Sequence, residues 1–83
     1  MGYKIVYKSS AFKDLKYLDK NIARHILYKL ETRLSDNPNC GTPLKGQFKG
    51  LLKYRIGDFR VVYTKTSSEV LILRIGQRKN VYK

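Results

Sequence analysis

The chain has 83 residues, a length that predicts a single domain with one small hydrophobic core. It carries 18 Lys and Arg against 6 Asp and Glu, a formal net charge of +12 that is typical of proteins that bind nucleic acid. One Cys and one His are too few for an internal disulfide or a four-ligand zinc site, and no apolar run is long enough to cross a membrane. We therefore expect residues 1–83 to form one reduced, metal-free and cofactor-free domain that is soluble in the cytoplasm.

The first half of the chain predicts one strand followed by two helices. Residues 3–7 are β-branched and aromatic, as in a strand, and Ser9 or Ser10 is placed to cap the helix that follows. Asn21 is placed to cap a second, longer helix. Apolar residues recur at helical spacing in both segments: Phe12, Leu15 and Leu18 in the first, and Ile22, Ile26, Leu30 and Leu34 in the second. The turn-rich residues 36–43 then predict a connecting loop.

From residue 51 onward the apolar period changes to 2, which indicates strands. Gly57-Asp58 predicts the turn of a β-hairpin in which Arg55 faces Arg60 and Lys53 lies on the same outer face. The other face is apolar and carries Tyr54, Ile56, Phe59, Val61 and Tyr63. After a turn at residues 66–68, residues 69–75 predict a central buried strand, and the tail beyond must lie against the sheet.

The predicted order β-α-α-β-β-β indicates a two-layer α+β domain, with a helical hairpin packed on one face of a mostly antiparallel, twisted sheet. The other face is then left open and basic, because the hairpin turns Lys53, Arg55 and Arg60 away from the helices. On the last strand, Arg74 and Arg78 share one parity and should join the same face. Like charges directly opposite each other, such as Arg55 and Arg60, destabilise a sheet. We therefore expect this face to bind an anion such as a phosphate.

The basic face could serve three kinds of function. Lysine, arginine and tyrosine are sufficient for phosphodiester cleavage in RNA, because lysine can act as a base when neighbouring cations favour its neutral form and arginine clamps phosphate. The same face could instead bind RNA or DNA without catalysis, or bind an acidic protein partner. The sequence contains no carboxylate pair, nucleophile motif or phosphate-binding glycine loop, and His25 and Cys40 are read as structural or incidental.

Three segments together resemble the RelE/ParE superfamily of bacterial and archaeal type II toxins, and the resemblance spans nearly the whole chain. They are Pro43-Leu44-Lys45-Gly46, Tyr54-Arg55-Ile56-Gly57-Asp58-Phe59-Arg60-Val61-Val62-Tyr63 and Ile75-Gly76-Gln77-Arg78-Lys79-Asn80-Val81-Tyr82. The resemblance implies the same fold. It also implies toxicity, since RelE-type members cut mRNA in the ribosomal A site through 2′-hydroxyl attack, whereas ParE-type members poison DNA gyrase.

For the RelE-type reaction, the resemblance implies that Lys53 is the general base, that Arg60 and Arg78 clamp the transition state, and that Tyr82 stacks on a base or transfers a proton. Further RNA contacts are expected from basic residues around this set, namely Lys45, Lys49, Arg55, Arg74 and Lys79. The implied partners are mRNA on the ribosome and a cognate acidic antitoxin, which would form a hetero-oligomer with the toxin by covering the basic face or displacing the tail.

Two positions depart from the RelE pattern. Leu51 stands where RelE has a further lysine, and Gln77 stands where many relatives have a histidine that can exchange protons. These departures leave open which groups act as base and acid, and whether the activity is RelE-like or ParE-like.

Overall fold

Five strands and two helices make up the computed structural model, which describes residues 2–44, 46 and 50–77. The strands are β1 (Lys4–Tyr7), β2 (Thr42–Pro43), β3 (Leu52–Ile56), β4 (Phe59–Lys65) and β5 (Glu69–Gln77). The helices are α1 (Ser9–Lys16) and α2 (Lys20–Lys29), and α2 continues into a π-helical turn, η1 (Leu30–Leu34). The predicted α+β fold, with a helical hairpin against a mostly antiparallel sheet, is confirmed.

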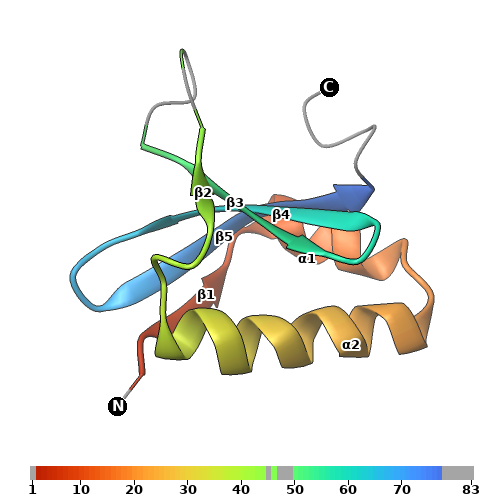
Figure 1. Cartoon of the computed structure of the whole chain (residues 1–83). Helices are drawn as coiled ribbons and strands as arrows, with labels where there is room; N and C mark the ends of the chain where they lie inside the picture. Colours follow the sequence, from red (N-terminus) through yellow and green to blue (C-terminus); the bar gives the residue numbers. More distant parts are fainter. Residues whose placement is uncertain (1, 45, 47–49, 78–83) are drawn as a thin grey trace.

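The strands form one sheet in the order β1-β5-β4-β3-β2. β1 runs parallel to β5, and every other neighbouring pair is antiparallel. In Figure 1, α2 runs beneath one face of the sheet, while α1 packs against β5. None of the helices in the described ranges is long and apolar enough to cross a membrane. The helix-covered face therefore builds the core, and the opposite face is the one predicted to be open.

The core lies between the sheet and the apolar stripe of α2 and η1. Ile26, Leu30 and Leu34 are almost wholly buried, as their spacing predicts, whereas Ile22 at the start of the helix is 38% exposed. The sheet contributes the predicted inner residues of the hairpin. Ile56, Val61 and Tyr63 are buried, and Tyr54 and Phe59 pack against them while partly buried. The predicted inner face is therefore confirmed.

The hairpin has the register that its turn predicts. Gly57 has a φ of 58° and Asp58 does not share the positive φ, a pattern that fits a type II′ turn. Arg55 then pairs with Arg60, and Lys53 pairs with Val62. Because side chains alternate along a strand, the two arginines and the lysine share the outer face of the sheet.

Both helix starts differ from the prediction. α1 has Lys8 as its N-cap residue without a side-chain cap, because Ser10 Oγ instead donates a 2.7 Å hydrogen bond to Leu73 O on β5. α2 starts after Asp19, whose carboxylate accepts a 3.1 Å hydrogen bond from the backbone N–H of Asn21. The predicted caps, a serine for α1 and Asn21 for α2, are therefore wrong. The Ser10 hydroxyl binds β5 instead of capping α1. The carboxylate of Asp19, two residues before Asn21, caps α2.

The segment predicted as a plain connecting loop ends in β2, and Tyr63 organises it. Tyr63 Oη donates a 2.7 Å hydrogen bond to Pro38 O and accepts a 3.1 Å hydrogen bond from Gly41 N–H, while the residue itself has no exposed surface. These bonds hold the segment so that Thr42 pairs with Lys53 on β3. The loop prediction missed β2 because this anchor joins residues 22 and 25 positions apart in the chain.

Replacing Tyr63 with phenylalanine is expected to lower the free energy of unfolding by about 1–3 kcal/mol, because Pro38 O and Gly41 N–H lose a buried partner. Burial also raises the pKa of Tyr63 from 10.0 to about 12. The unfolded chain therefore loses this proton first, so the stabilisation is complete below about pH 10 and disappears as the pH rises through about 12. Urea unfolding across this range measures both effects.

Tyr28→Phe is the matched control, since Tyr28 is 65% exposed on α2 and loses only its hydroxyl. Its unfolding curves should follow those of the wild type at each pH. Equal alkaline destabilisation of the wild type and the Tyr63→Phe variant would contradict the assigned role of the Tyr63 hydroxyl.

Candidate functional site

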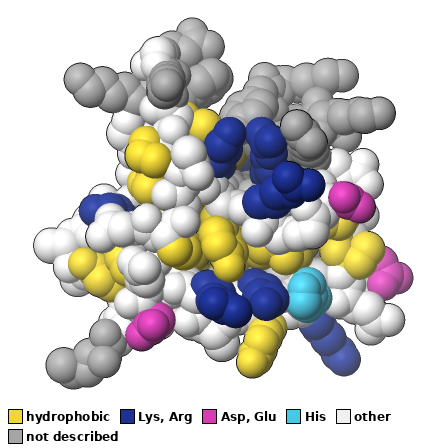
Figure 2. All heavy atoms as spheres, viewed as in Figure 1, with side chains coloured by type: hydrophobic (Ala, Val, Ile, Leu, Met, Phe, Trp, Pro, Cys, Tyr) yellow, Lys and Arg dark blue, Asp and Glu magenta, His cyan; other side chains and the backbone are white. Residues whose placement is uncertain are grey.

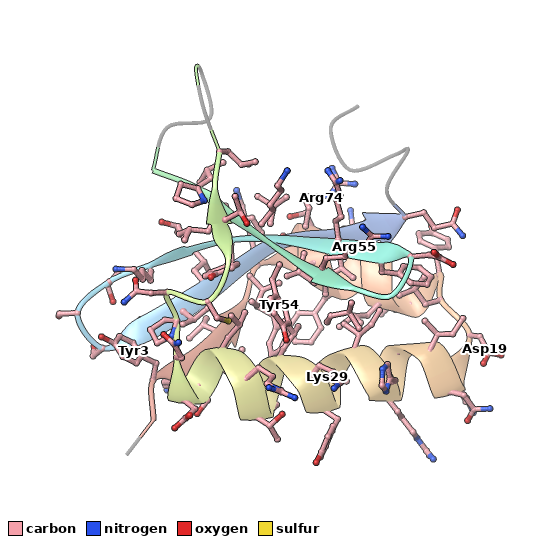
Figure 3. All side chains as sticks on the ribbon, viewed as in Figure 1. Tyr3, Asp19, Lys29, Tyr54, Arg55 and Arg74 are labelled. Carbon is pink, nitrogen blue, oxygen red and sulfur yellow. The ribbon has the colours of Figure 1, made fainter. Side chains whose placement is uncertain are left out.

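A hollow on the outer face of the sheet is lined by three cationic side chains. Thr42, Lys53, Arg55 and Arg60 enclose an open pocket of about 240 Å³. Figure 2 shows Lys and Arg side chains gathered above the sheet, and in Figure 3 Arg55 lies on the side away from α2 while Tyr54 points toward that helix. The structure therefore brings together three of the residues that the sequence singled out.

Strand pairing explains why these side chains converge. Arg55 and Arg60 are directly opposed across β3 and β4, which places their Cβ atoms about 5 Å apart. Lys53 lies two residues from Arg55 on the same strand and therefore faces the same way. Thr42 completes the wall from β2, opposite Lys53. No carboxylate is among the described residues that line the pocket, so its potential is positive and suits an anionic phosphodiester.

Burial distinguishes the three cations. Lys53 and Arg60 are half-buried, whereas Arg55 is exposed. Arg55 Nε donates a 3.0 Å hydrogen bond to Gly57 O, which holds its guanidinium beside the turn of the hairpin. A partly desolvated charge interacts more strongly with a bound anion than an exposed charge does. Lys53 and Arg60 are therefore the stronger candidates for direct chemistry, and Arg55 for support.

Arg74 lies outside this pocket. It pairs with Val62 across β4 and β5, which gives it the predicted parity, and Figure 3 shows it on the side of the sheet away from α2. Its guanidinium is bound by Asp14 of α1, with Nε 2.9 Å from Oδ2. Both residues line a different pocket, of about 440 Å³, between the helices and the end of the sheet. The Arg74 side chain is thus already bound to Asp14. Its contact with RNA stays a prediction.

The other predicted site residues lie outside the described residues. These are Arg78 and Tyr82, assigned to catalysis, and Lys45, Lys49 and Lys79, assigned to RNA binding. The last described residue, Gln77, pairs with Phe59 at the start of β4. The described chain therefore ends beside β4, the strand that carries Arg60. The roles of the five residues stay predictions.

Thr42 and Gly41 are the parts of the site that the sequence did not reveal. Thr42 belongs to a two-residue strand, which is too short to show a period of 2. Gly41 is required by close packing, because a Cβ on this residue would lie 2.5 Å from Tyr63 Oη and 2.7 Å from Lys53 O. The absence of a side chain at Gly41 thus lets β2 approach β3 and close the pocket.

Replacing Gly41 with alanine is expected to cost about 1–3 kcal/mol of unfolding free energy, because the added methyl group overpacks the contact with β3. Urea unfolding measures the change. Thr42→Ala, one residue further along and exposed, is the control and should stay close to wild type. An unchanged midpoint for Gly41→Ala would show that β2 can move away from β3 without cost.

A helical hairpin on one face of a twisted sheet is the fold that this chain shares with solved RelE-type toxin structures. The sequence matches the family described as "ParE toxin of type II toxin-antitoxin system, parDE" over residues 5–82. The chain therefore belongs to this family, within the RelE/ParE superfamily, and is a toxin of a type II toxin–antitoxin system.

Individual relatives agree with this assignment. The chain is 32% identical to "Toxin RelE" of Mycobacterium tuberculosis over 84 residues, which cover 98% of this chain and 87% of that protein. It is 27% identical to a chain of the toxin–antitoxin complex RelBE2 from the same organism, with a TM-score of 0.89 and coverage of 94% and 100% of the two chains. A chain of the archaeal RelE–RelB complex from Pyrococcus horikoshii has the same fold, with a TM-score of 0.74, 23% identity and coverage of 98% and 100%.

Proposed function

We propose that this toxin is an endoribonuclease that cleaves mRNA in the ribosomal A site and so stops translation. The observation that carries the proposal is the pocket in which Lys53, Arg55 and Arg60 converge. It offers a candidate base and two phosphate-binding groups on one face. Lys53 and Arg60 belong to the catalytic set that the resemblance to RelE-type members implies, and Arg55 is the expected additional phosphate contact. The similarity to a toxin named RelE adds support.

In the proposed reaction, Lys53 Nζ takes the proton of a ribose 2′-hydroxyl, and the 2′-oxygen attacks the adjacent phosphorus. The bond from phosphorus to the 2′-oxygen forms, and the bond to the 5′-oxygen breaks, so that a 2′,3′-cyclic phosphate and a 5′-hydroxyl result. Arg60 stabilises the negative charge that develops on the phosphorane oxygens, and Arg55 holds the neighbouring phosphate.

The tail would complete the reaction. Arg78 would add a second clamp on the phosphorane. Tyr82 would stack on a base or return a proton to the leaving 5′-oxygen. Gln77, which stands at the position of a histidine in many relatives, cannot exchange protons at neutral pH, so the acid must come from another group.

A cognate antitoxin would control this activity. A structural relative at 27% identity was determined as a toxin–antitoxin complex, which supports an antitoxin partner for this chain. With a net charge of +12 on the toxin, an acidic antitoxin segment across the basic face would be favoured electrostatically and would block access of RNA. Activity on the ribosome would place the free toxin in the cytoplasm.

The test adds purified protein to ribosomes that translate a defined message and maps the new 5′ ends by primer extension. Cuts within the A-site codon are expected. A message with a single 2′-deoxynucleotide at the cut position should stay intact there, because it lacks the nucleophile. Intact message on the ribosome would overturn the proposal, and cleavage of the 2′-deoxy message would overturn the mechanism.

Poisoning of DNA gyrase is the second candidate, because the family matched over residues 5–82 is that of ParE toxins. A supercoiling assay with purified gyrase separates the two candidates. Stabilised cleavage complexes on DNA together with intact mRNA would favour gyrase poisoning. RNA binding with neither activity would leave a non-catalytic nucleic-acid-binding module.

A further inference from the structure

The outer edge of β5 changes its partner half-way along the strand. β1 pairs with residues Glu69–Ile72 only, and in the described part of the chain no strand continues this pairing beyond Ile72. α1 takes over the exposed edge. Ser10 Oγ donates a 2.7 Å hydrogen bond to Leu73 O, and Ile75 N–H donates a 2.8 Å hydrogen bond to Asp14 Oδ2. Side chains of a helix thus replace the missing strand.

Asp14 accepts three hydrogen bonds from β5 with one carboxylate. Oδ2 accepts from Ile75 N–H at 2.8 Å and from Arg74 Nε at 2.9 Å, while Oδ1 accepts from Arg74 Nη2 at 3.3 Å. The Asp14 side chain is only 16% exposed. A bidentate guanidinium pair fixes the carboxylate in orientation as well as in place. Asp14 therefore holds both the backbone and a side chain of β5.

The bonded segment is the part of β5 that adjoins the candidate site. Ile75 pairs with Val61, and Gly76 pairs with Arg60. A shift of the strand at Ile75 would therefore move the backbone opposite Arg60.

The positive charge of the protein explains why the acidic side chain that holds β5, Asp14, forms an ion pair with Arg74. Asp14 is one of 6 acidic residues in a chain with a net charge of +12, and an acid close to an RNA-binding face would repel phosphate. Its ion pair with Arg74 compensates this charge locally. A neutral amide could accept the Ile75 N–H bond but would hold the guanidinium less strongly.

We propose that Asp14 is a positioning residue for RNA cleavage: its carboxylate anchors the end of β5 and thereby holds in place the backbone that pairs with Arg60. This inference rests on the proposed function, and it adds a residue of α1 that does not touch RNA. Asp14 should then affect the rate of the cleavage step rather than the binding of the ribosome.

The test compares Asp14→Ala and Asp14→Asn with the wild type in single-turnover cleavage of mRNA at increasing ribosome concentration. Asp14→Ala should lower the maximal rate constant about 10- to 100-fold, since misplacement by about 1 Å can cost that much, with an unchanged half-saturating concentration. Asp14→Asn keeps an oxygen acceptor for Ile75 N–H and should stay within about threefold of wild type.

Two control variants separate positioning from general effects. Ser10→Ala removes the hydrogen bond to Leu73 O on the same edge, two residues further from the tail. Asp36→Ala removes one exposed negative charge elsewhere. Both should cleave at nearly the wild-type rate. Equal cleavage by Asp14→Ala and the wild type, equal slowing by Ser10→Ala, or a change confined to the half-saturating concentration would overturn the proposal.

Amide hydrogen exchange at Ile75 tests the anchor independently of any activity. Exchange in Asp14→Ala should be at least about tenfold faster than in the wild type, while Asp14→Asn keeps most of the protection. Unchanged protection in Asp14→Ala would overturn the anchor itself. Intact message with the wild-type protein would instead overturn the proposed function, so the two failures are distinguishable.

Discussion

Replacing Arg60 with alanine is expected to lower the single-turnover rate constant of mRNA cleavage by about 10²–10³-fold, because one group that stabilises the phosphorane charge is lost. Arg60 is half-buried in the pocket, faces Arg55 across the hairpin and lies next to Gly76 on β5. It is thus fixed by strands on both sides, as preorganised electrostatic stabilisation requires. Primer extension over time, at saturating ribosomes, measures the rate.

Two further variants sharpen this result. Arg60→Lys keeps the charge but loses the two-pronged geometry of the guanidinium, so its rate should lie between those of the wild type and Arg60→Ala. Arg24→Ala removes an equal charge from the exposed surface of α2 and should stay within about threefold, as expected for a remote charge under salt screening. An Arg60→Ala protein that cleaves like the wild type would contradict a role for Arg60 at the phosphate.

The hairpin could be predicted from the sequence in residue detail because its determinants are local. A two-residue turn fixes the pairing, and a period of 2 then assigns every side chain to a face. That is why Arg55 opposite Arg60, with Lys53 beside them, follows from about twelve consecutive residues. The i,i+4 apolar stripe of α2 and η1 could be predicted in the same way, and Ile26, Leu30 and Leu34 of this stripe are buried.

The parts that could not be predicted depend on contacts between distant segments. β2 exists because Tyr63 holds Pro38 and Gly41, and a two-residue strand carries no pattern of its own. Asp14 and Arg74 are 60 positions apart, so parity alone placed Arg74 on the basic face without its partner. Local patterns therefore define faces and registers, whereas long-range contacts decide which cations of a face are already engaged.

Replacing Lys53 with alanine is expected to reduce cleavage by about 10²–10⁴-fold, the usual contribution of a general base. Lys53 is the only lysine among the described residues that line the pocket. The two arginines beside it cannot take the 2′-hydroxyl proton, because a guanidinium donates hydrogen bonds but offers no acceptor. Binding of the ribosome should change little, since one charge among 18 basic residues is lost.

Lys53→Arg separates the role of a base from that of a charge. Arginine at this position keeps the positive charge in the pocket but cannot accept a proton, so Lys53→Arg should be nearly as slow as Lys53→Ala. If Lys53→Arg instead cleaved at close to the wild-type rate, Lys53 would act through its charge alone, and the proton would have to go to another group. Single-turnover rates of the three proteins on the same ribosomes decide between these roles. In either case, the pair of variants tells whether the pocket performs acid–base chemistry or only holds a phosphate.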